Sequence, residues 1–283
     1  MIPLKARRSG SSTEFEATDR IARAAKESAL LHQASRVNRY LIPRHLAEFV
    51  FENQMIFVTE ILQGKSVTEI CIGKKEVEKI ADAIRQNQDV LSQTSLGKEL
   101  IAEASRATSY YKTKVAKFLK SHFDINIGFE ELAFLEPLEE LRRSSAVIVS
   151  DRSPANFVIH EDRVGAYDFE VAFAGVAFED WSWFIDDPRL NTSISWQEIL
   201  HLFCEDYAKV DRRSEAEITQ SFFISSIFVC IKQSCMMLAM GEAEMSNHYL
   251  ACATRSAKQS TNKEAIELVR RLREKSPYEI RNE

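Results

Sequence analysis

The sequence predicts an α+β fold in which short strands are set into a mainly helical chain. Residues 147–170 show apolar, β-branched runs around two polar breaks, which indicates strand, loop, strand, turn and strand. Residues 47–60 form two apolar runs around a polar turn, which is typical of a β-hairpin. Elsewhere apolar residues recur at a spacing of three or four, as they do on the buried face of a helix.

Helices are expected on both sides of the strands. Those before the strands are predicted over residues 14–39, 76–91, 99–123 and 129–143. Pro43 favours the end of the first, since proline disfavours helix in the residue before it. Ser195 and Ser214 are each followed by Glu at the third position, the capping-box pattern that begins a helix. Two further helices are predicted over residues 243–256 and 263–275.

Composition places the chain among ordinary globular proteins. Its 283 residues can bury one large core or two lobes, and 45% are hydrophobic and 28% charged. The net charge of -5 argues against a nucleic-acid partner, because no basic stripe is available to displace counterions from a phosphate backbone. A mildly acidic protein suits a small substrate, including a cationic one.

The cysteines and the apolar stretches bear on location. The five cysteines show no metal-ligand spacing, so reduced thiols in a cytoplasmic protein are the simplest account. The N-terminal residues contain no apolar run of signal-peptide length. The stretch from Ile218 to Met240 is interrupted by Lys232, Gln233 and several serines, so we expect a buried helix and no membrane partner. The scattered histidines predict no zinc site. The oligomeric state is left open.

The loop between the first two strands of residues 147–170 carries the candidate chemistry. Asp151 and Asn156 lie on it, and Asp168 ends the third strand. Phosphoryl transfer needs a carboxylate that accepts the proton of an attacking hydroxyl, and oxygen ligands that hold Mg²⁺ against the nucleotide phosphates. These three residues supply that set. An Asp five residues before an Asn also occurs by chance, so the pattern gains its weight from its place between apolar strands.

The order Asp-x-x-x-x-Asn, hairpin, Asp-Phe-Glu resembles the catalytic and metal-binding segments of the aminoglycoside phosphotransferase and choline kinase superfamily. The resemblance implies an ATP- and Mg²⁺-dependent transfer of a phosphoryl group to a hydroxyl of a small molecule. It makes Asp151 the catalytic base and Asn156 and Asp168 the metal ligands. Gly175 and Asp180 continue the match, and Asp180 is implied to brace the catalytic loop.

The same resemblance implies a protein-kinase-like, two-lobed fold. Residues 1–64 would form the small nucleotide-binding lobe and hinge, and residues 65–283 the mainly helical catalytic and acceptor-binding lobe. Lys5, in a short strand candidate, is implied to pair with Glu27 and with the nucleotide phosphates. Glu60 and Leu62 fall in the hinge that receives adenine. The plainer interpretation is a solvated terminal lysine and an exposed helix carboxylate.

The sequence departs from the family pattern in two places. The family usually has His and Gly directly before the catalytic Asp, where this chain has Val149 and Ser150. Four residues precede Lys5, which leaves no room there for the two strands and the phosphate loop that usually come first. We therefore expect a truncated small lobe and weak nucleotide binding, unless an upstream segment supplies the loop. A weak or inactive kinase-like binding or regulatory protein is the alternative.

The C-terminal helices build the acceptor pocket in the resembling enzymes. Acidic side chains there bind amino groups, and aromatic ones enclose a quaternary ammonium by cation–π attraction. The candidates in this chain are Glu179, Asp186, Asp187, Glu205 and Asp206 for the first, and Trp181, Trp183 and Trp196 for the second. Solvated charges and packed tryptophans are the simpler account of each.

Overall fold

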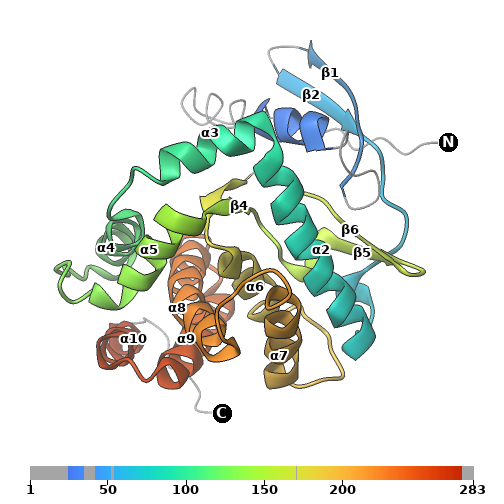
Figure 1. Cartoon of the computed structure of the whole chain (residues 1–283). Coiled ribbons are helices and arrows are strands. Elements are labelled where there is room, and N and C mark those ends of the chain that lie inside the picture. Colours follow the sequence, from blue (N-terminus) through green and yellow to red (C-terminus); the bar gives the residue numbers. More distant parts are fainter. Residues whose placement is uncertain (1–24, 35–41, 52–53, 170, 276–283) are drawn as a thin grey trace.

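A computed structural model describes residues 25–34, 42–51, 54–169 and 171–275, and shows a mainly helical chain with a few short strands (Figure 1). The predicted α+β class is confirmed. Of the helix expected over residues 14–39, the middle is described and is helical over residues 25–34. The expected strand around Lys5 lies outside the described residues.

The predicted N-terminal hairpin is present. Strand β1 (His45–Phe51) pairs antiparallel with β2 (Gln54–Thr59). The helix over residues 25–34 contacts this hairpin, and the Ser28 hydroxyl lies 3.0 Å from a ring nitrogen of His45 on β1. Figure 1 shows this hairpin at the upper right edge of the molecule, apart from the C-terminal helices.

Two small sheets carry the candidate catalytic loop. Strands β3 (Lys65–Ser66), β5 (Phe157–His160) and β6 (Arg163–Ala166) form an antiparallel sheet, and β4 (Val147–Val149) pairs with β7 (Phe173–Gly175). The predicted order of strand, loop, strand, turn and strand is therefore confirmed at β4, β5 and β6. Sheets this small are stable only when other elements cover them.

The helices before the strands differ in part from the prediction. Helix α2 (Lys74–Gln93) agrees with it, but the helix expected over residues 99–123 is two helices, α3 (Ser95–Ala104) and α4 (Tyr110–Phe123). The carboxylate of Glu139 accepts hydrogen bonds from three backbone N–H groups in the first turn of α4, at 2.7 to 3.1 Å. Because those donors have no partner within their own helix, the remote carboxylate favours a new helix start.

The helix expected over residues 129–143 is shorter than predicted. A 3₁₀ turn occupies Ala133–Leu135, and α5 runs over Glu136–Ser145. Pro137 lies in the first turn of α5. Proline is favoured there, because its missing N–H would have no intrahelical partner and its φ is already helical. The α5 helix begins seven residues after the predicted start.

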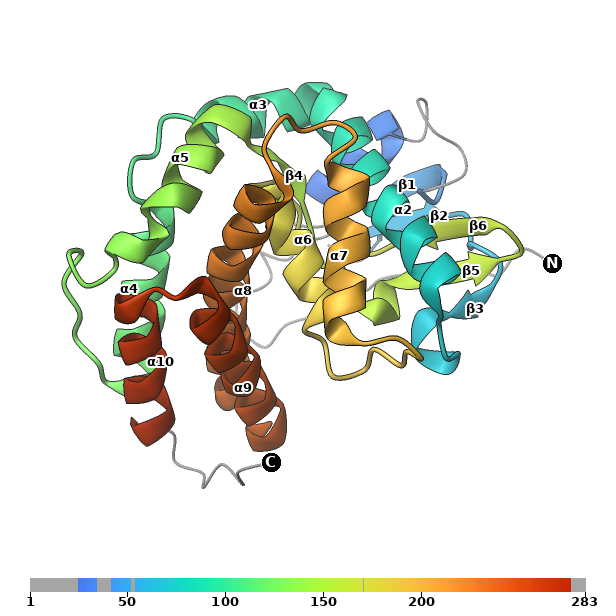
Figure 2. The ribbon, with the colours of Figure 1, turned by 60° about the horizontal axis from the view of Figure 1, so that its bottom comes forward.

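Up to residue 275, where the described part of the chain ends, five helices follow the strands: α6 (Ala177–Ile185), α7 (Trp196–Tyr207), α8 (Glu215–Ala239), α9 (Ala243–Ser260) and α10 (Lys263–Lys275). Both predicted capping boxes are confirmed, since Ser195 and Ser214 accept from the N–H of Glu198 and Glu217. Figure 2 shows α8 and α9 lying side by side, and α8 also packs on α4 and α6.

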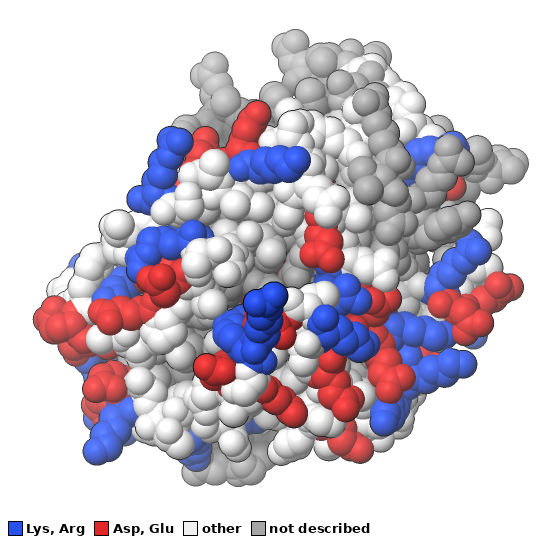
Figure 3. All heavy atoms as spheres, in the orientation of Figure 1, with Lys and Arg blue, Asp and Glu red and all other residues white. Residues whose placement is uncertain are grey.

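Helix α8 is long and apolar enough to pass a length-and-composition test for a membrane span, but 67% of its most apolar window is buried inside the protein. It is the buried helix that the sequence predicted. All five cysteines are free thiols, and every one except Cys71 is buried. On the face shown in Figure 3, the described Lys and Arg side chains are interspersed with Asp and Glu.

Candidate active site

Asp180 holds the start of the candidate catalytic loop. It lies fully buried on α6, where Oδ1 accepts from the backbone N–H of Ser150 at 2.9 Å and Oδ2 accepts from Gln88 at 2.8 Å. Burial raises the pKa of Asp180 to about 7, against the nearby Arg152 charge and these two hydrogen bonds. Asp180 therefore contacts the candidate catalytic loop directly, as the resemblance implied, and the loop group that it binds is the backbone N–H of Ser150.

Gly175 lies beside Glu179 and Val149, where a side chain has no room. A Cβ at this position would lie 2.4 Å from Oε1 of Glu179 and 2.8 Å from Cγ2 of Val149. That Glu179 oxygen accepts from the Tyr111 hydroxyl at 2.7 Å and from the N–H of Val176 at 3.1 Å, so it cannot move away without breaking buried hydrogen bonds. A residue without a side chain is therefore needed at the end of β7.

Asp151 lies half-buried at the start of the loop. Its Oδ1 accepts from the N–H of Ser153 at 3.0 Å. Burial raises the pKa of Asp151; the Ser153 hydrogen bonds oppose this rise, and the neighbouring Asp168 carboxylate adds to it. A carboxylate whose pKa is raised is a better proton acceptor than an ordinary surface Asp.

Asn156 and Asp168 lie next to Asp151. The Asn156 side chain donates from Nδ2 to the backbone carbonyl of Asp151 at 2.9 Å, and the backbone carbonyl of Asn156 accepts from the N–H of Tyr167 at 3.0 Å. Asp168 follows directly and has a left-handed backbone, with φ of 69°. Such a conformation is strained for a residue other than glycine and is concentrated at functional sites. An amide oxygen and a carboxylate in one place form a donor set that suits Mg²⁺.

Glu27 connects the N-terminal helix to this site. It is 3% exposed, and its Oε1 accepts from the backbone N–H of Phe169 at 3.0 Å. The neighbouring Lys26 donates to the carbonyl of Ala172 at 2.5 Å. The plainer interpretation of Glu27 as an exposed carboxylate is therefore wrong. The predicted partner Lys5 lies outside the described residues.

The two predicted hinge residues lie between β2 and β3. The N–H of Glu60 donates to the carbonyl of Arg44 at 2.8 Å, which continues the hairpin pairing by one residue. The Leu62 side chain packs on the backbone of β6, since a Cβ at Gly165 would come within 2.6 Å of Leu62 Cδ1. Leu62 therefore contacts the strand that leads to Asp168.

Sequence reasoning gave no role to two cations near Asp151. Arg152 is fully buried, with its guanidinium 4.3 Å from the centre of the Phe169 ring, and burial lowers its pKa. Lys232 on α8 lies close enough to Asp151 and Glu179 for their charges to interact. Neither could be recognised in the sequence. Arg152 is an unspecified position of the motif, and Lys232 is a polar break in an apolar helix.

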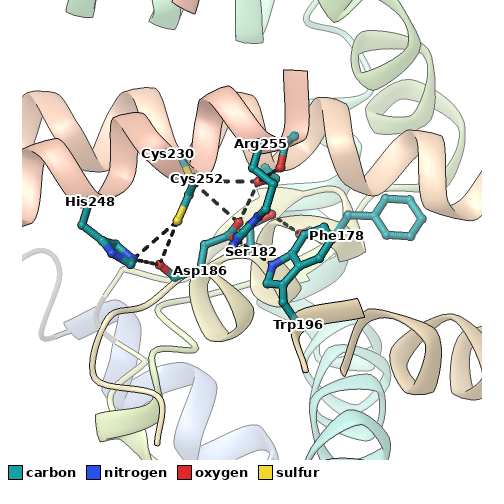
Figure 4. A network of polar contacts seen from close by, with 10 residues as sticks. Phe178, Ser182, Asp186, Trp196, Cys230, His248, Cys252 and Arg255 are labelled. Carbon is teal, nitrogen blue, oxygen red and sulfur yellow. Dashed lines mark hydrogen bonds and ion pairs between the residues drawn. The ribbon is translucent and has the colours of Figure 1, made fainter. Parts of the chain in front are cut away.

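The acidic candidates for acceptor binding are engaged inside the protein. Asp186 accepts from Arg255 at 2.6 Å, from Ser226 at 2.7 Å and from the Trp196 indole at 3.3 Å. Figure 4 shows Arg255, Trp196 and His248 converging on Asp186. The other four carboxylates contact Tyr111 (Glu179), Arg189 (Asp187), His201 (Glu205), and Arg85 and Lys209 (Asp206). The simpler account of solvated charges fits Glu205, which is exposed, and is wrong for the other four carboxylates, which are buried and paired within the protein.

The three tryptophans are also engaged. Trp181 is 2% exposed and packs among the rings of Phe178, Phe203 and Tyr207. The Arg255 guanidinium lies 4.1 Å from the Trp196 ring, and the Lys232 ammonium lies 4.9 Å from the Trp183 ring. Packing, the simpler account, therefore describes Trp181, and the rings of Trp183 and Trp196 each face a cation of the protein.

Comparisons with known proteins bear on the fold. No protein-family model and no curated protein sequence matches the chain. Solved structures do. The GDP complex of aminoglycoside 2′-phosphotransferase-IIIa matches with a TM-score of 0.55 and 12% identity, over 86% of this chain and 83% of that one. Choline kinase from Cryptosporidium parvum matches with a TM-score of 0.54 and 12% identity, over 87% and 81%.

A third solved structure matches over nearly the whole chain. The amicoumacin kinase complex with AMP-PNP, Ca²⁺ and its ligand has a TM-score of 0.53 and 11% identity, and the match covers 98% of this chain and 84% of that one. At these identities the similarity concerns the fold. The chain therefore has a protein-kinase-like fold, which it shares with these solved phosphotransferase and kinase structures.

Proposed function

We propose that the chain is a kinase that transfers the γ-phosphoryl group of ATP to a hydroxyl of a small molecule. This proposal rests on one observation, that groups distant in sequence meet at one place. Glu27 accepts a hydrogen bond from the backbone beside Asp168, and the carboxylates of Asp168 and Asp151 lie close enough for their charges to interact. Asp180 accepts a hydrogen bond from the backbone at the start of the Asp151 loop. The fold supports the same function, and similar solved structures contain GDP and AMP-PNP.

In this proposal residues 1–64 form the nucleotide-binding lobe and hinge, and residues 65–283 bind the acceptor. Glu60 and Leu62 lie beside the adenine, and the packing of Leu62 on β6 supports that place, since β6 leads to Asp168. Lys5 and Glu27 act on the phosphate side. Glu27 also fixes the backbone that follows Asp168.

Asn156 and Asp168 would hold Mg²⁺, which when bound neutralises charge on the nucleotide phosphates. Their oxygens are the ligands that a hard cation prefers. The Nδ2 of Asn156 is used in the bond to the Asp151 carbonyl, so its amide oxygen is the atom that remains for a cation. The backbone pairing of Asn156 with Tyr167 keeps Asn156 and Asp168 adjacent.

Asp151 accepts the proton of the acceptor hydroxyl. The hydroxyl oxygen forms a bond to the γ-phosphorus, the bond between that phosphorus and the leaving ADP oxygen breaks, and the proton moves to the carboxylate. The Ser153 N–H fixes one carboxylate oxygen. The raised pKa of Asp151 favours proton acceptance once the group is ionised.

A non-catalytic kinase-like protein is the competing function, and the replacement of His and Gly by Val149 and Ser150 favours it. One observation weakens it. Asp180 supports the loop through the backbone N–H of Ser150, so the loop is held without the missing histidine. A chain that had lost its activity would have no need of this support for an Asp151 whose carboxylate faces Asp168.

The test compares Asp151→Asn with Asp162→Asn. Asp162 is an exposed carboxylate in the turn between β5 and β6, where it pairs with Lys79, so it is a matched control. Transfer of labelled γ-phosphate to a panel of hydroxyl compounds should fall by about 10² to 10⁴ in the Asp151 variant, the usual worth of a general base, and stay unchanged in the control. Calorimetric titration should show intact nucleotide binding in both. Equal rates in the two variants would remove Asp151 from the reaction.

A further inference from the structure

Lys232 is a partly buried cation on α8. Its ammonium lies 4.9 Å from the centre of the Trp183 ring on α6 and 5.5 Å from that of Phe173 on β7. Burial lowers its pKa, against the attraction of Glu179 and Asp151. Among the described residues, it forms no ion pair and no hydrogen bond with a carboxylate. Since desolvating a charge is costly, and the two carboxylates that attract Lys232 do not contact it directly, its position points to a ligand.

A second lysine adds to the positive charge there. Lys114 on α4 lies 5.6 Å from the centre of the Tyr110 ring, and its charge repels that of Lys232. Within the described part of the chain, no carboxylate bridges the two. A ligand with a negative group would relieve the repulsion and give Lys232 a direct ion-pair partner. Because Phe173, whose ring the Lys232 ammonium faces, pairs with Val149 two residues before Asp151, that ligand would lie beside the catalytic loop.

A cationic acceptor fits this region poorly. The acidic candidates are bound to arginines, lysines, a histidine or a tyrosine of the protein, and the Trp183 ring already faces an ammonium. A like charge brought to Lys232 would be repelled. The expectation that the acidic protein takes a cationic substrate came from its overall charge of -5, which does not describe the local charge beside Asp151.

We propose that the acceptor carries an anionic group, a carboxylate or a phosphate, which binds Lys232 while its hydroxyl faces Asp151. This inference rests on the proposed kinase function for the identity of the acceptor. It makes Lys232 a specificity-determining residue. The aromatic rings of Trp183 and Phe173 form the apolar surround in which such a charge pair is strengthened by the low local dielectric.

The experiment measures binding without ATP and Mg²⁺, so that its result does not depend on phosphoryl transfer. The probes are glycerate, glycerol 3-phosphate, glycerol and choline, which all carry a hydroxyl and differ in charge. Calorimetry of the full chain should show binding of at least one anion in preference to glycerol and choline. Glycerate alone would indicate a carboxylate acceptor, and glycerol 3-phosphate alone a phosphate.

Three variants assign the preference to Lys232. Lys232→Met should weaken anion binding by about ten- to a hundredfold, the worth of a hydrogen bond to a charged group, and Lys232→Arg should retain most of it. Lys117→Met, at an exposed position of α4, is the matched control and should bind like the wild type. Lys232→Met should keep its thermal stability, because methionine has a similar length and needs no counterion.

The outcomes separate this inference from the proposed function. Lys232-dependent anion binding without transfer from ATP to any probe would support the acceptor site and refute the kinase. Transfer to choline or glycerol at rates unchanged in Lys232→Met would support the kinase and overturn the anionic acceptor. Failure of both anions to bind, or anion binding that survives Lys232→Met, would also overturn it.

Discussion

Glu139 should contribute strongly to stability although it lies on a helix rich in charged residues. It is 3% exposed on α5, and its two oxygens accept from the N–H groups of Tyr110, Tyr111 and Lys112. These donors begin α4, which carries Lys114 and the Tyr111 hydroxyl that binds Glu179. Glu139→Ala removes all three acceptors at once.

The expected cost follows from these contacts. The N–H of Tyr111 is buried and would be left without an acceptor, which costs about 1 to 3 kcal/mol. The negative charge at the positive end of α4 is worth about 1 kcal/mol more. We therefore expect a loss of about 2 to 4 kcal/mol in the free energy of unfolding, and a fall in Tm of about 5 to 10 °C for a chain of this size.

The matched control is the neighbouring Glu140→Ala. Glu140 is exposed and pairs with Arg143 on the surface of α5. Surface pairs of this kind are worth about 0.5 kcal/mol or less, so the control should unfold almost as the wild type does. Denaturant titrations followed by circular dichroism measure both, and Glu139→Gln should lie between them. If Glu139→Ala and Glu140→Ala unfolded at the same denaturant concentration, the carboxylate would not stabilise the start of α4.

Three further predictions concern the carboxylates of the candidate active site. Asp168→Asn should abolish the Mg²⁺-dependence of nucleotide binding, seen by calorimetry with and without the ion, whereas Asp162→Asn should keep it; equal dependence in both would argue against Asp168 as a metal ligand. Because the pKa of Asp151 is raised and the base must be ionised, kcat/KM should fall at acid pH with a midpoint above about 4, the pKa of an ordinary Asp. A midpoint at or below that value would contradict this. The pKa of Asp180 is raised to about 7, so its contribution to the free energy of unfolding is present below about pH 4 and is lost as pH rises through 7. Asp180→Asn should therefore make the free energy of unfolding less dependent on pH between about 5 and 8, as measured by denaturant titration. An unchanged dependence on pH would count against this.

The sequence by itself predicted what depends on neighbours along the chain. Apolar runs bounded by polar turns predicted β1, β2 and the strands around Asp151, and the capping boxes at Ser195 and Ser214 predicted the starts of α7 and α8. Asp151, Asn156 and Asp168 could be placed together because one loop and one hairpin span all three. Within a turn or a hairpin, spacing fixes which groups meet.

The tertiary structure decided how charges and rings are paired. The break between α3 and α4 depends on Glu139, which lies 27 to 29 residues away, and the state of Asp186 depends on Arg255, 69 residues away. The sequence shows that such charges exist, but their partners are set by which helices pack together. Lys232 is the clearest case, because the packing of α8 against α6 brings it near Asp151. Burial in that place lowers the pKa of a lysine that the sequence does not distinguish from any other.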